Sequence, residues 1–251
     1  MATYVLVHGA WLGGWCYRET AQALRNAGHQ VFTPTLTGNG ERAHLQRRDI
    51  SLETHILDIC GCLVSEELVA ADEVILAGHG YGGMVITGVA DRMPQRVSAL
   101  AYIDAFVPQH WQSVDGLLRA ASASGALAPF DARRLSGCNS GRRWLPPPRA
   151  EDFGVAPHRR AWVDRRSTQQ ARATFDMPIL LTGAAGDIAR RGYLLAAGWA
   201  NNPFAGVARS LASAPGWQVD TVDGGHLVMV DRPAELAAWL LRFRGYSLSR
   251  T

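Results

Sequence analysis

The chain contains no lysine, because all 25 of its basic residues are arginine. A lysine Schiff base and a lysine general base are therefore excluded. The 22 acidic residues leave a net charge of only +3, and acidic and apolar residues separate the arginines of the middle section. Without a concentrated basic patch, nucleic-acid binding is not indicated.

Cysteines and long hydrophobic runs are also scarce. The four cysteines have no spacing typical of a disulfide framework or a zinc site, and the histidines show no metal-ligand spacing either, so we expect neither a metal nor a cofactor. The first apolar run, residues 4–7, is four residues long and has no basic leader. We therefore expect no signal peptide and no membrane span, and a cytoplasmic protein.

What the chain does contain is an alternation of apolar runs and amphipathic segments. With 251 residues, 47% of them hydrophobic and 19% charged, it has the composition of one globular domain with an insertion. The alternation predicts a doubly wound, mostly parallel α/β sheet. Strands are predicted at residues 4–8, 30–34, 73–77, 97–106, 177–182 and 217–222, and helices at residues 15–27, 52–68, 84–92 and 233–243.

The alternation is interrupted from about Pro108 to about Arg172. We interpret residues 108–172 as an inserted helical cap without strands, and residues 1–107 and 173–251 as the core domain. Ligand sites are mostly apolar concavities, so aromatic residues of the cap and of nearby loops could line a substrate pocket, although aromatic residues are core residues more often than ligand contacts. The candidates are Trp11, Phe106, Trp111, Phe130, Trp144, Phe153 and Trp162.

Three motifs follow predicted strands at their carboxyl ends. The segment His-Gly-Ala-Trp at 8–11 follows the first strand, Gly-His-Gly-Tyr-Gly-Gly at 78–83 follows the strand at 73–77, and Gly-Gly-His at 224–226 follows the last strand. The second segment stands where a strand-to-helix elbow presents a nucleophile. Here that position is Gly80, which has no side chain to attack a substrate.

On these motifs the chain resembles, over essentially its full length, the α/β-hydrolases of the plant methylesterase and hydroxynitrile lyase type and their bacterial relatives. Those proteins generally have serine at the position of Gly80. The resemblance implies an α/β-hydrolase fold with an oxyanion hole formed by the backbone amides of Ala10 and Tyr81, and with His226 as general base. Glycine accepts the strained backbone of the elbow more easily than serine.

Two acids are candidates for orienting His226. Asp187 stands at the acid position that is usual in this fold, after the predicted strand at 177–182, and it is preferred. Asp104 ends the predicted strand at 97–106, which is an alternative acid position in some members of the fold. Either carboxylate would fix the tautomer of the imidazole and stabilise the imidazolium. A surface position for Asp187 and a pocket-lining position for Asp104 are the structural alternatives.

Three functions are compatible with these residues. In the preferred one, the His–Asp pair and the backbone oxyanion hole catalyse non-covalent chemistry on a small hydrophobic carbonyl compound: elimination, decarboxylation, cyclisation or isomerisation. A variant keeps hydrolysis, with a water in place of the serine hydroxyl. Cyanohydrin cleavage is disfavoured, because the lyases of this family have lysine where this chain has Leu227.

The second hypothesis is a serine esterase or lactonase inactivated by an engineered serine-to-glycine change at position 80. The third is a non-catalytic protein that binds a small molecule. All three predict a small-molecule ligand and no nucleic-acid or membrane partner, and a homodimer is compatible with each.

Overall fold

The computed structural model describes residues 1–69, 73–123, 143–200 and 202–245. Six strands form a parallel sheet in the order β2-β1-β3-β4-β7-β8. They are β1 (Thr3–Val7), β2 (Gln30–Phe32), β3 (Val74–His79), β4 (Ala99–Ile103), β7 (Arg190–Ala196) and β8 (Trp217–Val222). The predicted doubly wound α/β fold is confirmed.

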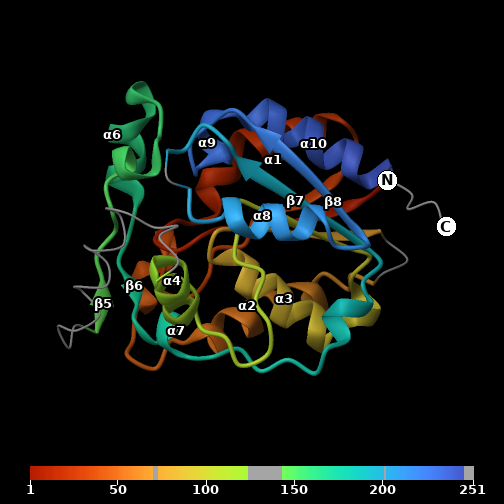
Figure 1. The fold of residues 1–251 in the computed structure, drawn as a ribbon, viewed down its shortest axis with the longest axis horizontal. Coiled ribbons are helices and arrows are strands. Elements are labelled where there is room, and N and C mark those ends of the chain that lie inside the picture. Colours follow the sequence, from red (N-terminus) through yellow and green to blue (C-terminus); the bar gives the residue numbers. More distant parts are fainter. Residues whose placement is uncertain (70–72, 124–142, 201, 246–251) are drawn as a thin grey trace.

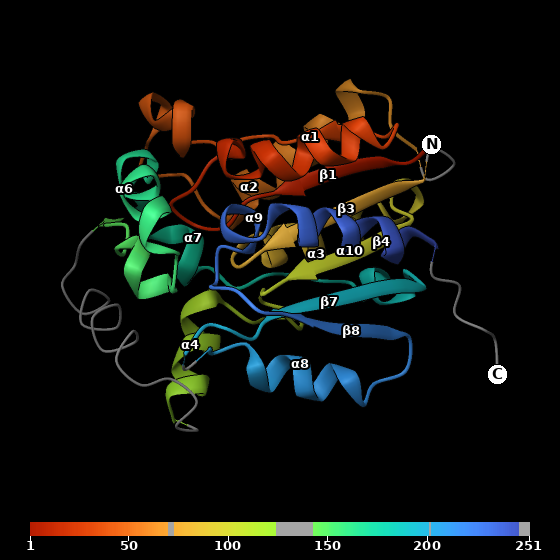
Figure 2. The ribbon, with the colours of Figure 1, turned by 90° about the horizontal axis from the view of Figure 1, so that it is seen from above.

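Helices cover both faces of the sheet (Figures 1 and 2). One face carries α1 (Arg18–Asn26), α9 (Val228–Asp231) and α10 (Pro233–Gly245), and the other carries α2 (Leu52–Ser65) and α3 (Gly82–Arg92). Helix α8 (Ala205–Ala212) packs against β7 and β8. Two sequence signals set these bounds: Gly28, with φ +82°, follows the end of α1, and proline opens α10.

The predicted cap lies beyond the carboxyl ends of the strands (Figure 2). It contains α4 (Val114–Ala123) and α6 (Pro157–Arg166), as expected of a helical insertion, and α7 (Ala173–Asp176) follows it. It also contains an antiparallel pair, β5 (Trp144–Leu145) and β6 (Gln170–Ala171), where no strand was predicted. Two residues per strand are too few to produce an alternation that sequence patterns reveal.

The strand predicted at residues 177–182 is wrong, because this segment is irregular. Ile179 forms backbone hydrogen bonds with a loop instead of the sheet: its N–H donates to the carbonyl of Gln112, and its carbonyl accepts from the N–H of Trp111, both at 2.8 Å. Leu180 is 59% exposed. The strand that precedes β8 is β7, which begins with two arginines. The penultimate strand therefore starts 13 residues later than predicted, and this shift changes which residues reach the site described below.

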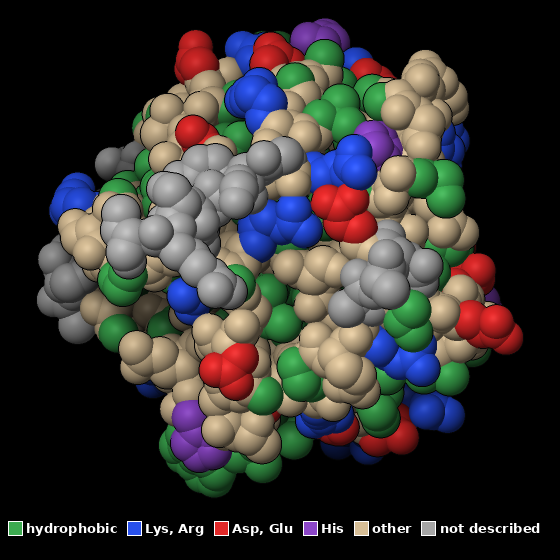
Figure 3. Space-filling model, turned by 90° about the vertical axis from the view of Figure 1, so that its right-hand side faces the viewer, with side chains coloured by type: hydrophobic (Ala, Val, Ile, Leu, Met, Phe, Trp, Pro, Cys, Tyr) green, Lys and Arg blue, Asp and Glu red, His purple; other side chains and the backbone are tan. Residues whose placement is uncertain are grey.

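The opposite end of the molecule, where the strands begin, has mixed charge. Arginine and acidic side chains are intermingled there (Figure 3). Glu73 accepts from Arg244 at 2.7 Å and lies 3.4 Å from Arg190. Within the part of the chain that the structure describes, no helix is long and apolar enough to cross a membrane.

Candidate active site

The turn between β3 and α3 has the geometry of a nucleophile elbow. Gly80 lies at its apex with φ +51°, in the left-handed region that favours glycine. Helix α3 starts so close to the end of β1 that a Cβ on Gly82 would lie 2.6 Å from the carbonyl oxygen of Val7. The glycines of the segment 78–83 therefore let the helix begin directly against the sheet, with residue 80 turned toward the carboxyl end.

The missing side chain of residue 80 would point at His226. A Cβ built on Gly80 would lie 3.2 Å from Nε2 of His226 and 3.4 Å from Cε1. A hydroxyl one bond further on would be within hydrogen-bond reach of that nitrogen. The elbow is thus aimed at the histidine even though it carries no nucleophile.

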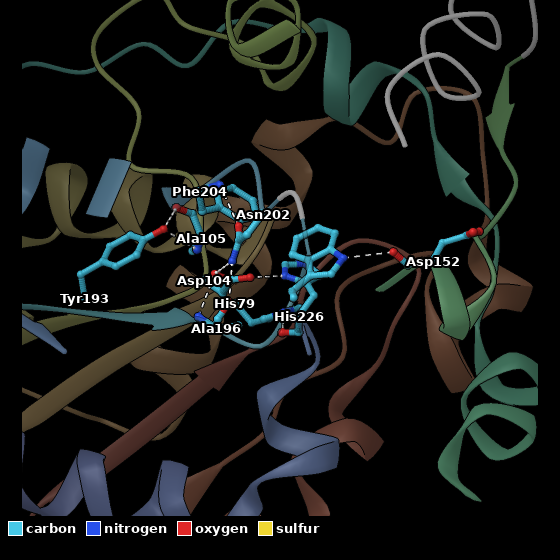
Figure 4. A network of polar contacts seen from close by, with 10 residues as sticks. His79, Asp104, Ala105, Asp152, Tyr193, Ala196, Asn202, Phe204 and His226 are labelled. Atoms are coloured by element: carbon cyan, nitrogen blue, oxygen red, sulfur yellow. Dashed lines mark hydrogen bonds and ion pairs between the residues drawn. The ribbon is translucent and has the colours of Figure 1, made fainter. Parts of the chain in front are cut away.

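His226 is held in place from its backbone and from its ring. It is nearly buried in the loop after β8, and its N–H donates to the carbonyl of Phe153 at 2.8 Å. Its ring Nδ1–H donates to Oδ2 of Asp104 at 2.7 Å (Figure 4). This bond leaves Nε2 as the ring atom that faces residue 80, in the tautomer that a general base requires.

Asp104 is fully buried directly after β4, with φ +45°. Burial raises the pKa of its carboxyl to about 7, against the hydrogen bonds that lower it. Oδ1 accepts from Nδ2–H of Asn202 at 2.7 Å and from the N–H of Ala196 at 3.1 Å. With His226 on Oδ2, three donors surround this carboxylate, as a buried charge requires.

The structure places Asp104, and not the preferred Asp187, beside His226. Asp187 is exposed and ends a short 3₁₀ helix, Ala184–Asp187. Its candidacy depended on a strand at 177–182, and that segment lies outside the sheet. Because β4 is a central strand next to β3, its carboxyl end brings Asp104 to the same edge as the elbow.

The two backbone amides expected to bind an oxyanion are anchored by their neighbours. Among the described residues, no carbonyl or side chain accepts a hydrogen bond from the N–H of Ala10 or of Tyr81. Trp11, next to the first amide, is tied to the cap: its N–H donates to Oε1 of Gln170 and its indole N–H to the carbonyl of Leu145. Tyr81, at the start of α3, adds the positive end of that helix's dipole.

Three further histidines have structural contacts around these amides. His8 donates from Nδ1 to the carbonyl of Gly9 and accepts at Nε2 from the N–H of Leu36. His55 accepts at Nδ1 from the hydroxyl of Tyr81 at 2.9 Å. Burial lowers the pKa of both histidines to about 4.

His79, the third of these histidines, holds the backbone of the loop that carries His226. Its Nε2–H donates to the carbonyl of His226 at 2.9 Å, and the two rings are 4.2 Å apart. Burial, followed by the neighbouring His226, holds the pKa of His79 well below its ordinary value. It therefore adds no positive charge next to the ring of His226.

An apolar cavity of about 30 Å³ opens between the elbow, His226 and the cap. Among the described residues that line it, the ionisable side chains are His79, His226 and the Tyr81 phenol, whose pKa burial raises well above its ordinary value. Three predicted pocket residues do line it: Trp11, Phe106 and Phe153. It is also lined by residues that the sequence analysis did not single out, namely Leu12, Leu118, Phe175, Trp199, Pro203 and Phe204.

The other predicted pocket residues lie elsewhere. Trp111 is 67% exposed, Trp162 packs edge-to-face on Trp15 at 4.9 Å, and Trp144 lies in β5 and is not among the residues that line the cavity. Phe130 lies outside the described residues. The missed Trp199 and Phe204 follow β7, so correct placement of that strand was the signal that could have found them.

Aromatic rings enclose the imidazole of His226. Trp199, Phe153 and Phe204 have ring centroids 4.7, 5.2 and 5.6 Å from it, and Phe204 is stacked at 18°. The indole N–H of Trp199 donates to the carbonyl of Asp152 in the cap. Exclusion of water strengthens electrostatic interactions inside such a site, and ring faces attract a cation such as imidazolium.

Comparisons with known proteins agree with this geometry. A family model described as "Alpha/beta hydrolase family" matches residues 4–239. A carbendazim-hydrolysing esterase from Nocardioides sp. (strain SG-4G) is 50% identical over 238 residues, which cover 94% of this chain and 97% of the esterase. Methyl jasmonate esterase 1 of Vitis vinifera is 32% identical over 105 residues, which cover 42% of this chain and 40% of the relative.

Two solved structures share the fold. An extracellular α/β-hydrolase from a Paenibacillus species superposes with a TM-score of 0.79 at 22% identity, covering 96% of this chain and 98% of that one. Tomato methylketone synthase I, in complex with 2-tridecanone, superposes with a TM-score of 0.72 at 18% identity, covering 97% and 98%.

Proposed function

The chain belongs to the α/β-hydrolase family, and from this premise we propose that it hydrolyses a carboxylic ester or a carbamate by direct attack of water. One observation carries the proposal: the Cβ position of residue 80 lies 3.2 Å from Nε2 of His226. A water that occupies the place of a serine hydroxyl would donate to that nitrogen. The esterases among the similar proteins favour hydrolysis over lyase or isomerase chemistry.

The reaction would follow from the hydrogen bonds of the site. Nε2 of His226 takes a proton from the water, whose oxygen forms a bond to the carbonyl carbon of the substrate. The carbonyl oxygen becomes an oxyanion and accepts from the amides of Ala10 and Tyr81. Asp104 stabilises the imidazolium through Nδ1–H. The carbon then breaks its bond to the leaving alcohol or amine, which takes the proton back from His226, and an acid is released.

The cavity lining indicates the substrate class. Among the described residues, the lining is aromatic and aliphatic and holds no arginine that could pair with a substrate carboxylate, which favours a neutral, flat, apolar compound. The similarity to an esterase that hydrolyses carbendazim supports a carbamate or ester of that kind. Ligand pockets usually measure about 300–1,000 Å³, and the cavity of about 30 Å³ is smaller than these, so a compact acyl group is favoured at the elbow.

The residue that the source gene encodes at position 80 decides the route of hydrolysis. A serine codon there would mean that the natural protein proceeds through an acyl-enzyme, with the same base and the same oxyanion hole. A glycine codon would leave water as the nucleophile. Sequencing of the source gene at this codon separates the two.

Gly80 itself favours one second candidate, which is base-catalysed chemistry without a nucleophile. In this reaction His226 would remove or relay a proton, and the same two amides would bind an enolate. Decarboxylation of a β-keto acid is the form of this chemistry that is simplest to assay. It differs from hydrolysis in its product, because carbon dioxide is released and no acid and alcohol pair is formed.

The test compares the protein with its His226→Ala variant on an aryl acetate and an aryl methyl carbamate. We expect hydrolysis by the protein, a loss of about 10²–10⁴-fold in the variant, and no acyl adduct in intact-protein mass spectra during turnover. His44→Ala, at an exposed histidine, is the matched control and should retain full activity. Hydrolysis that is independent of His226, or decarboxylation without hydrolysis, would refute the proposal.

A further inference from the structure

We propose that Asn202 is a positioning residue for the reaction proposed above, and that its side-chain amide holds the Asp104 carboxylate in the orientation and the ionised form that His226 requires. Asn202 lies in the loop after β7, far in sequence from Asp104 and 24 residues before His226. The inference rests on the proposed function for its kinetic part. Its structural part can be measured without turnover.

The side chain of Asn202 uses all of its polar atoms. Nδ2 donates to Oδ1 of Asp104 at 2.7 Å and to the carbonyl of Ala196 at 2.9 Å, and Oδ1 accepts from the N–H of Phe204 at 2.8 Å. These bonds fix the amide orientation, because a flipped amide would place its oxygen against the two acceptors. The donor is therefore locked onto Asp104 (Figure 4).

The two oxygens of the Asp104 carboxylate accept hydrogen bonds from different donors. Oδ2 accepts from His226, while Oδ1 accepts from Asn202 and from the backbone of Ala196. A carboxylate free to rotate about its Cβ–Cγ bond would not keep one oxygen on the imidazole. Two donors on Oδ1 remove that freedom and direct Oδ2 at Nδ1.

The same donors oppose the cost of burial. Burial raises the pKa of Asp104 to about 7, and the Asn202 hydrogen bond is the first of the interactions that lower it. The titratable groups that face Asp104 are His226 after β8, His79 on β3 and Tyr193 on β7. Burial favours the neutral form of His79, and among the described residues no arginine lowers the pKa of Asp104. The amide of Asn202 is therefore the main side-chain donor, besides His226, that stabilises the ionised carboxylate.

Asn202 also connects the His–Asp pair to the wall of the cavity. Its Oδ1 fixes the backbone of Phe204, whose ring stacks on His226, and the same loop carries Trp199. The loop after β7 thus supplies a neutral donor to Asp104, the acid that directly follows β4. The side chain of Asn202 therefore positions two groups that contact the imidazole: the Asp104 carboxylate, which bonds Nδ1, and the Phe204 ring, which stacks on its face.

The experiment measures kcat/KM against pH for Asn202→Leu, a change to an apolar side chain of similar size. Loss of the donor should raise the pKa of Asp104 and move the acidic limb of the profile up by about one unit. The rate at pH 6 should then fall about tenfold further than the rate at pH 9. A merely structural role would lower the rate equally at all pH values. Asn26→Leu, at an exposed asparagine on α1, is the matched control.

A second measurement keeps the test open if the leucine variant does not fold. Asn202→Asp preserves the shape of the side chain and places a second carboxyl group against Asp104, so the two groups would share a proton. ¹³C NMR of the aspartate carboxyls should then show two coupled titrations, one of them with an apparent pKa above that of Asp104 in the unmodified protein. An unshifted acidic limb in Asn202→Leu, or an independent titration of residue 202, overturns the inference while hydrolysis still stands. Absence of hydrolysis in the unmodified protein refutes the proposed function and leaves the NMR test decisive for Asn202.

Discussion

A serine placed at position 80 should acquire covalent reactivity and lose stability, by amounts that the structure indicates. The new Cβ would lie 3.2 Å from Nε2 and 3.4 Å from Cε1 of His226. Carbon atoms in optimal contact are about 3.5–4.0 Å apart, so the imidazole must withdraw by a few tenths of an ångström. Such a shift keeps the introduced hydroxyl within hydrogen-bond reach of Nε2.

The backbone at residue 80 sets the cost in stability. With φ at +51°, a side chain costs roughly 1–2 kcal/mol relative to glycine. For a chain of this size that corresponds to a decrease in Tm of roughly 2–8 °C. Gly80→Ala is the matched control, because it carries the same strain without the hydroxyl and should show the same decrease.

The assay is covalent labelling by a fluorophosphonate, followed by intact-protein mass spectrometry, together with the burst of 4-nitrophenol from an aryl ester. We expect one label per chain in Gly80→Ser, none in Gly80→Ala, and labelling at least 10²-fold slower when His226→Gln is added. A folded serine variant that shows the expected Tm and takes no label would refute the inference that a side chain at residue 80 points at Nε2 of His226. Equal labelling without His226 would refute its role as base.

The remaining predictions concern the acid and the cavity wall. Asp104→Asn should reverse the tautomer of His226 and lower turnover about 10²–10⁴-fold, whereas Asp187→Asn should leave turnover unchanged; steady-state kinetics of the two variants decides between the acids. Turnover should rise with pH through about 7, as Asp104 ionises, and a rate independent of pH from 5 to 9 would contradict this. The pKa of Asp104 is raised from 3.8 to about 7, so ionisation of this carboxyl destabilises the folded protein. The free energy of unfolding, measured by urea titration and compared with that of Asp104→Asn, should therefore fall as the pH rises from 4 to 7. Trp199→Ala should raise KM for an aromatic ester and lower Tm, whereas Trp111→Ala, at a 67% exposed residue, should change neither.

Much of the sheet could be predicted from the sequence, because its central strands are buried on both faces and appear as short apolar runs. β1 and β3 are of this kind. The position of His226 was predicted from the Gly-Gly-His motif after the last predicted strand, although β8 is a partly exposed edge strand with polar residues. Parallel strands end at one edge of a sheet, so residues that follow different strands were expected to meet there.

The prediction failed where a strand begins with charged residues. The run at 177–182 is more apolar than β7, which starts with Arg190 and Arg191. Both arginines are accommodated at the sheet: Arg190 lies near Glu73, and the guanidinium of Arg191 lies over the ring of Trp217 at 5.1 Å. A long side chain can bury its aliphatic stem in this way while its charge finds a partner, and a single-sequence pattern does not reveal that partner.

The error in the strand and the error in the acid have one cause. The sequence pattern put the penultimate strand too early, so Asp187 was taken for the residue that follows it. In the structure that strand is β7, and the loop after it brings Trp199, Asn202 and Phe204 to the site. An acid from this loop is then unnecessary, because β4 delivers Asp104 to His226 directly.

This arrangement also explains why a buried, strained carboxylate is tolerated. Asp104 has a positive φ and no exposed surface, which together cost stability. Its N–H donates to the carbonyl of Leu194 at 2.7 Å, and its Oδ1 accepts from Ala196, so β7 itself holds both ends of the residue. The strand that the sequence pattern missed is therefore the one that holds the backbone of the acid, so the position of Asp104 depends on the register of β4 against β7 as well as on Asn202 in the loop that follows.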